Sequence, residues 1–197
     1  QIDDYAFHKC NSLKQVNLPP NLKTIGEGIF LSCSNLVEVD FQCKLTKIPC
    51  GLFTCCDSLK NFTIPSTTLS IRGNAFFGCY SLEKVEIPAS VKKINNNAFK
   101  NCKSLVELII LSNSLTQIPA GFCSGCKKLE KIVLPSSVTE IMESAFEDCS
   151  SIVEITLPPS LISIGELAFG RCDSIKEIDI PPSVKEIGPC AFKKCYE

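Results

Sequence analysis

The chain has 197 residues, 45% of them hydrophobic, so it can bury a core and is not a disordered protein. Its 20 Lys and Arg residues nearly balance its 21 Asp and Glu residues, which argues against nucleic acid as a partner, because nucleic-acid-binding domains usually carry a basic excess. With one histidine, His8, and no apolar run of roughly 18 residues, the sequence predicts neither a histidine-dependent catalytic site nor a membrane span in this segment.

A repeat with a period of about 23 residues runs along the whole chain. The segments SAFEDCSSIVEITLPPSLISIGE (144–166) and LAFGRCDSIKEIDIPPSVKEIGP (167–189) align without a gap, so that Phe146 matches Phe169 and Cys149 matches Cys172. The phenylalanine column comprises Phe7, Phe30, Phe53, Phe76, Phe99, Phe146, Phe169 and Phe192. The cysteine column comprises Cys10, Cys33, Cys56, Cys79, Cys102, Cys126, Cys149, Cys172 and Cys195.

Each repeat predicts the same elements in the same order. The part L-x-x-I-x-I-P predicts a strand that ends at proline, because proline cannot donate a ladder hydrogen bond. V-x-x-I predicts a second, shorter extended side, and I-G-x-x-A-F-x-x-C predicts a 3₁₀ or single helical turn. One such coil cannot bury its own apolar side, whereas coils stacked about 4.8 Å apart bury it continuously.

The register slips once, between the fifth and sixth coils. The step from Ile94 to Ile118 is one position longer than the other steps of that isoleucine column, so one extra residue lies in the loop 111–114. After the slip, Cys123 falls in the phenylalanine column and Phe122 in the small-residue position before it. The CxxC spacing of Cys123 and Cys126 therefore follows from the repeat, and we expect Phe122 to fill the gap, with no redox or metal site.

The repeated string resembles the BspA-like leucine-rich repeat family over essentially all 197 residues, as in SLEKVEIPASVKKINNNAFKNC (81–102). This resemblance implies a β-rich leucine-rich repeat solenoid, a single domain over 1–197 with parallel strands in a right-handed coil of about eight 23-residue repeats. It also implies a non-catalytic protein-binding module, often on cell surfaces with adhesive or host-contact roles. Departures at Gln42, Thr68, Leu111 and Cys123 predict small kinks.

Partners of leucine-rich repeat solenoids usually bind the strand face, whose outward columns here are mostly polar. In the middle of that face two apolar residues, Ile109 and Val133, are predicted to point outward, with Val106 and Val153 beside them. Exposed apolar clusters rimmed by charge tend to mark interaction sites, although β-branched residues also suit any strand. The predicted protein-binding residues are Val106, Ile109, Val133 and Val153, with Lys84, Glu86, Glu107, Lys131 and Glu154 around them.

Two further features leave alternatives open. The acidic outward residues (Glu38, Asp40, Glu154, Glu177 and Asp179) either meet a basic partner or keep the sheet edge soluble. The cysteine column predicts a ladder of buried reduced thiols, which suits a reducing cytosol or an anaerobic habitat, whereas the family resemblance implies a cell surface.

The ends of the sequence raise a further expectation. Neither end shows the polar capping unit that a solenoid core needs, so we expect a longer native chain or a second chain that covers the ends. An intracellular scaffold and end-to-end self-association into an array therefore stand as alternatives to a surface adhesin. In each case the expected partner is a protein, and no cofactor or metal is expected.

Overall fold

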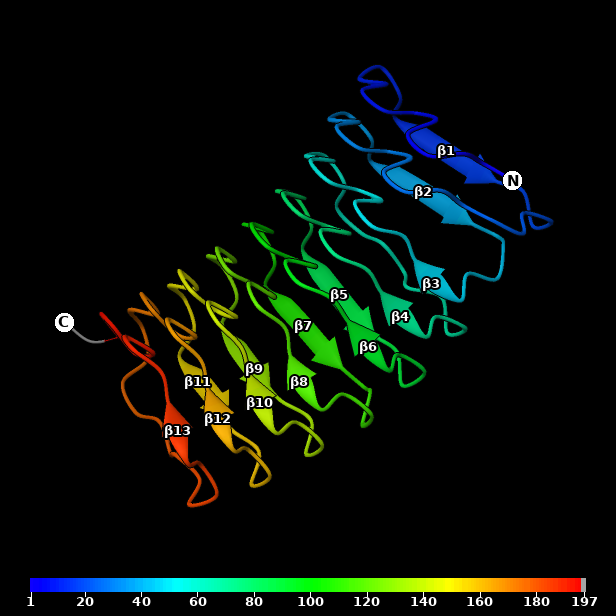
Figure 1. The fold of residues 1–197 in the computed structure, drawn as a ribbon. Coiled ribbons are helices and arrows are strands. Elements are labelled where there is room, and N and C mark those ends of the chain that lie inside the picture. Colours follow the sequence, from blue (N-terminus) through cyan, green and yellow to red (C-terminus); the bar gives the residue numbers. More distant parts are fainter. Residues whose placement is uncertain (196–197) are drawn as a thin grey trace.

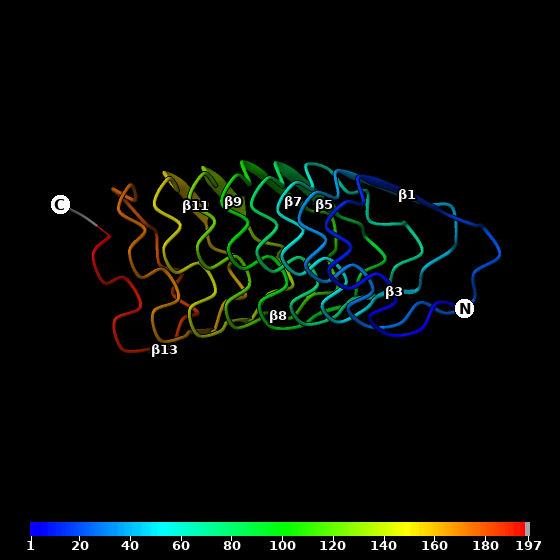
Figure 2. The same ribbon diagram turned by 90° about the horizontal axis from the view of Figure 1, so that it is seen from above.

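Residues 1–195 form an elongated solenoid of parallel strands in the computed structural model, with the two ends of the chain at opposite ends of the stack (Figures 1 and 2). Most coils present a longer strand on one face, named here the long-strand face, and a two-residue strand on a second face. The longer strands are β1 (Gln15–Leu18), β2 (Glu38–Phe41), β5 (Lys84–Ile87), β7 (Glu107–Ile110), β9 (Lys131–Val133) and β11 (Glu154–Thr156). The short strands are β3 (Lys47–Ile48), β4 (Ser70–Ile71), β6 (Lys93–Ile94), β8 (Gln117–Ile118), β10 (Glu140–Ile141), β12 (Ser163–Ile164) and β13 (Glu186–Ile187).

Equivalent residues of successive coils stack on one another, as the repeat predicts. Strand β5 pairs in parallel with β7, with Lys84 opposite Glu107 and Val85 opposite Leu108. Along β5 the side chains alternate between exposed and buried, because successive strand residues point to opposite faces. The apolar columns therefore form one continuous core inside the coil, and the predicted solenoid is confirmed.

The predicted 3₁₀ or helical turn is wrong, because no helix occurs within residues 1–195. In the second coil the N–H groups of Leu31 and Cys33 donate to the carbonyls three residues earlier and so form tight turns. The N–H groups of Phe30 and Ser32 instead donate to carbonyls of the next coil, at 3.2 and 2.7 Å. Gly28 and Ser32 have positive φ angles of 55° and 58°. A 3₁₀ helix needs consecutive right-handed residues, so these left-handed residues replace it with a third ladder between coils.

The cysteine column is held by a hydrogen bond that the repeat pattern does not reveal. Every thiol of this column from the second coil onward donates to a carbonyl of the preceding coil, as in Cys56 Sγ to Phe30 O at 3.0 Å. Cysteine suits this position because it is small and apolar and still carries a weak donor. A hydroxyl column joins the coils in the same way, for example from Ser90 Oγ to Thr68 O at 2.7 Å.

The phenylalanine column changes its packing at the register slip. Phe146 and Phe169 stack with their ring centroids 5.4 Å apart and an interplanar angle of 10°. Phe122 instead packs edge-to-face against Phe99 and Phe146, at 5.6 and 6.0 Å, and is fully buried. The prediction that Phe122 turns inward beside Cys123 is confirmed.

The extra residue of the slip is absorbed in the loop 111–114. Ser112 is fully buried, its hydroxyl donates to the Val91 carbonyl, and it accepts the Ser114 N–H at 3.2 Å. The short strands form two separate sheets on either side of this point, β3–β4–β6 and β8–β10–β12–β13. The insertion therefore leaves the core continuous while it interrupts the ladders at the surface.

The long-strand face is likewise divided, into the pairs β1–β2, β5–β7 and β9–β11. The turn side, by contrast, carries hydrogen bonds between consecutive coils along its length. Grooves open on the long-strand face beside β2 and between β7 and β9, where these ladders are interrupted. Among the residues described, no helix is long and apolar enough to cross a membrane.

Candidate protein-binding site

A groove lies where the ladder between β7 and β9 is interrupted. Its volume is about 310 Å³, and Val106, residues 107–110, Lys131 and Val133 line it; we call it the β7/β9 groove. The interruption coincides with the extra residue in the loop 111–114, which directly follows β7. Five of the predicted binding residues line this groove, namely Val106, Glu107, Ile109, Lys131 and Val133.

The apolar part of the predicted site is only partly as expected. Val106 and Val133 are 44% and 53% exposed, but Ile109 is half-buried instead of pointing fully outward. Val153 is strongly exposed but does not line the groove. Its N–H donates to the Glu130 carbonyl, and Glu130 occupies the position of this column between Val106 and Val153, so Val153 lies one coil further from the groove. The groove therefore presents two exposed valines around a half-buried isoleucine, which suits an apolar side chain of a partner.

Two ion pairs flank the groove. Lys84 Nζ lies 2.9 Å from Glu107 Oε2, and Lys131 Nζ lies 2.6 Å from Glu154 Oε1. Each pair joins two strands that also share a ladder, β5 with β7 and β9 with β11. The hydrogen bond to the Glu107 carboxylate raises the pKa of Lys84, so the lysine stays charged. All four side chains are more than half exposed, so these pairs contribute little to stability and form a charged but neutralised rim.

The remaining predicted rim residue lies to one side. Glu86 is on β5 and lines a neighbouring groove of about 240 Å³ together with Lys84. It pairs in register with Ile109 of β7, so it borders the site without lining the β7/β9 groove. The sequence analysis located the register slip but did not predict that the sheet opens beside it.

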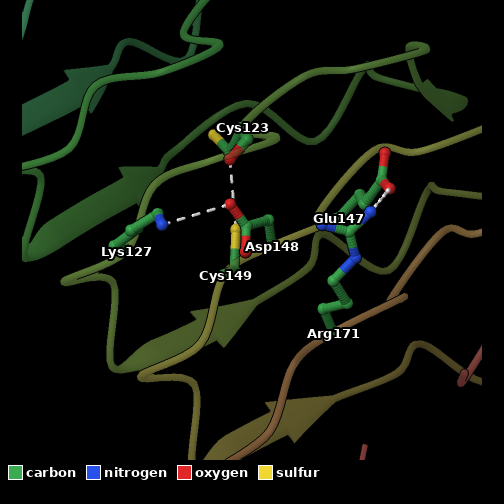
Figure 3. A network of polar contacts seen from close by, with 6 residues as sticks. All are labelled: Cys123, Lys127, Glu147, Asp148, Cys149 and Arg171. Carbon is green, nitrogen blue, oxygen red and sulfur yellow. Dashed lines mark hydrogen bonds and ion pairs between the residues drawn. The ribbon is translucent and has the colours of Figure 1, made fainter. Parts of the chain in front are cut away.

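The CxxC segment is part of the core. Cys123 and Cys126 are both fully buried, and the Cys149 thiol donates to the Cys123 carbonyl at 3.1 Å (Figure 3). The nearby charges, Lys127 and Asp148, form a surface ion pair at 3.5 Å. Burial raises the pKa of Cys123 well above its usual value, and a protonated thiol is a poor nucleophile.

Other reactive groups are sparse on the described surface. His8, the one histidine, is exposed. Residues 1–195 contain no group of three or more His, Cys, Asp or Glu side chains placed to hold a metal ion.

The family model described as BspA type Leucine rich repeat region matches six copies over residues 1–106 and 70–197. The chain belongs to the BspA-type leucine-rich repeat family. Leucine-rich repeat proteins generally act in protein interactions and are known as non-catalytic repeat proteins. Among curated protein sequences, none matches this chain significantly.

Several solved structures of bacterial leucine-rich repeat proteins are similar to this chain. A protein from Bacteroides ovatus is 31% identical with a TM-score of 0.90, and one from Eubacterium ventriosum is 25% identical with a TM-score of 0.74. A leucine-rich cell surface protein from Faecalibacterium prausnitzii is 26% identical with a TM-score of 0.55. These matches cover 95%, 93% and 98% of this chain but only 49%, 59% and 67% of the three proteins, so the chain spans about half the length of the Bacteroides protein.

Proposed function

We propose that this chain is a protein-interaction module whose partner binds the long-strand face at the β7/β9 groove. The observation that carries this proposal is the coincidence of three features at one place: a broken ladder, a groove of about 310 Å³ and the exposed valines Val106 and Val133. The outward columns of the long-strand face are mostly polar, so this groove offers an apolar contact that a partner can bury.

The flanking ion pairs indicate which kind of side chain the partner uses at this groove. Glu107 and Lys131 are already engaged by Lys84 and Glu154, so a partner gains little from charges aimed at this rim. An aliphatic or aromatic side chain packed against Ile109 and Val133 gains more, because central apolar anchors surrounded by near-neutral contacts dominate most interfaces. The partner we propose is therefore a protein with an apolar protrusion.

A surface role with adhesive or host contact is the finer form of this proposal. The similarity to a cell surface protein from Faecalibacterium prausnitzii supports it. An intracellular scaffold and a self-stacking array stay alternatives. Light scattering over a range of concentrations separates them in part: growth in particle size indicates stacking, whereas a constant monomer mass indicates a binding module.

The test is the double substitution Ile109→Asp with Val133→Asp. Two carboxylates in the groove oppose burial of an apolar partner, and we expect binding to fall at least a hundredfold while the circular dichroism spectrum stays unchanged. The matched control is Leu69→Asp with Ile162→Asp, which alters two side chains of similar exposure, 46% and 43%, beside the short strands. Partner proteins captured by the wild-type chain are measured against each variant by biolayer interferometry. Equal binding to all three chains contradicts the proposal.

A further inference from the structure

A second break in the long-strand face lies between β2 and residues 60–64. Within residues 1–195 no backbone hydrogen bond joins these two segments, although Glu83 N–H of the following coil donates to Lys60 O at 3.1 Å. A groove of about 530 Å³ lies between them, lined by residues 37–41 on one side and by residues 60–63 and Pro65 on the other. We call it the β2 groove. It shares no lining residue with the β7/β9 groove.

Aromatic side chains accompany this second break. Phe62 takes the column that Val85 and Leu108 occupy in the next two coils, since Asn61 pairs with Lys84. The Phe62 ring packs on Phe53 at 4.9 Å and on Phe41 at 5.4 Å, both at steep angles. A ring is larger than a valine and needs more room, which accounts for the missing ladder between β2 and residues 60–64 while the core beneath stays packed. The packing of the Phe62 ring in the core therefore explains why the β2 groove opens here.

The edge of β2 that faces this groove carries backbone groups suited to a further strand. Glu38 N–H donates to Lys14 O, at 3.3 Å, in the preceding coil. Because parallel strands direct alternate residues to opposite neighbours, the N–H and C=O groups of Val39 and Phe41 face the groove. An edge of this kind is a template for an extended peptide, whose main chain supplies the matching donors and acceptors.

The side chains around the β2 groove indicate the chemistry of that peptide. Glu38 and Asp40 are exposed on the outward side of β2 and take part in no ion pair among the residues described. The apolar surface here comprises Val37, which is 45% exposed, and the half-buried Phe41. In an added strand, side chains alternate between these two environments, so basic residues would face the carboxylates and apolar residues the floor.

We propose that the β2 groove binds an extended segment of a protein partner, with alternating basic and apolar residues, as an added strand on β2. The contact is separate from the β7/β9 groove and goes beyond the function proposed above. Main-chain hydrogen bonds to Val39 and Phe41 give affinity, and Glu38 and Asp40 select the positive charges.

The test uses a fluorescein-labelled hexapeptide, Lys-Val-Lys-Val-Lys-Val, titrated with the full chain while fluorescence anisotropy is measured. We expect saturable binding. The same peptide N-methylated at residues 2–6 keeps its charge but loses the backbone donors on both of its edges, so its dissociation constant should rise at least tenfold. The acidic peptide Glu-Val-Glu-Val-Glu-Val should not bind. Equal binding of the methylated and unmethylated peptides overturns the added-strand geometry.

Substitutions locate the contact. The variant Glu38→Lys with Asp40→Lys should weaken binding of the Lys-Val peptide at least tenfold. The control Glu177→Lys with Asp179→Lys makes the same charge change in the same columns far along the solenoid and should leave binding unchanged. The Ile109→Asp/Val133→Asp variant should also bind the peptide normally, so failure of this inference is distinguishable from failure of the proposed function. A loss of binding in the Glu177/Asp179 control equal to that in the Glu38/Asp40 variant contradicts the site.

Discussion

Replacement of Phe122 by alanine removes the ring that holds the core together at the register slip. The ring is fully buried and contacts Phe99 and Phe146 edge-to-face at 5.6 and 6.0 Å. Deletion of a buried phenylalanine typically costs about 3–5 kcal/mol, since the transfer free energy is lost and a cavity remains. Cys123 is too small to fill that cavity, so we expect Phe122→Ala to lie within this range.

The opposite change, Cys123→Phe, restores the residue that the repeat pattern specifies. In the native core it introduces a second ring where Phe122 already fills the space and where Cys123 is fully buried. Overpacking of this kind usually costs about 1–3 kcal/mol. The substitution toward the family pattern is therefore expected to destabilise the protein.

The double variant Phe122→Ala/Cys123→Phe exchanges the two sizes and recreates the Ala-Phe order of the other coils, as at Ala145 and Phe146. One ring then occupies one space, so we expect the double variant to unfold within about 1 kcal/mol of the wild type. The coupling between the two sites is then at least about 3 kcal/mol, well above the value for independent positions.

Urea denaturation followed by far-ultraviolet circular dichroism measures the four free energies of the cycle, with the slope of each transition compared to check that the unfolding unit is unchanged. Additive effects of the two substitutions would show that Phe122 and the residue-123 side chain do not compete for the same space. A neutral Cys123→Phe variant would contradict the reasoning equally, because it would require an unfilled volume beside Phe122.

Two further predictions concern the cysteine column. Burial raises the pKa of Cys79, Cys102 and Cys172 above the ordinary thiol value, so the folded chain keeps protons that the unfolded chain releases above about pH 9. The free energy of unfolding therefore stays constant below that pH and falls above it, by about 1.4 kcal/mol per pH unit for each such thiol. The free energy is measured from pH 8 to pH 10 in the presence of a phosphine reductant, and a constant value over this range contradicts the prediction. Thiol titration of the denatured protein without reductant should count all 14 cysteines, whereas a markedly lower number would show that part of the column is oxidised.

Much of the fold was predictable from the sequence because the same columns recur in every repeat. A residue such as Val85 needs only its equivalents in the neighbouring repeats to be placed in the core, and stacking then follows. The slip at 111–114 and the inward position of Phe122 were predictable for the same reason, since a one-residue offset changes which side chain falls in each column. Strand alternation predicted that Ile109 and Val133 point outward; Val133 is exposed, whereas Ile109 is half-buried.

The turn conformation was not predictable from residue spacing. Three-residue spacing is shared by a 3₁₀ turn and by the observed pattern, and the left-handed φ angles at positions such as Ser32 decide between them. Ser32 accepts that conformation because its N–H donates to the next coil, and this partner exists only in the stacked structure. The hydrogen bonds of the cysteine column depend on the stacking in the same way.

The repeat by itself determined the solenoid fold, the residue columns and the position of the register slip, because these follow from the periodicity of the sequence. Tertiary structure alone decided where the sheet opens. The sequences of two coils can align residue by residue, and yet their strands lack a ladder when a larger core side chain or an extra loop residue separates them. Phe62 accompanies the break beside β2, and the loop 111–114 accompanies the break between β7 and β9. The grooves that result depend on the spacing between neighbouring coils, which a single repeat does not contain.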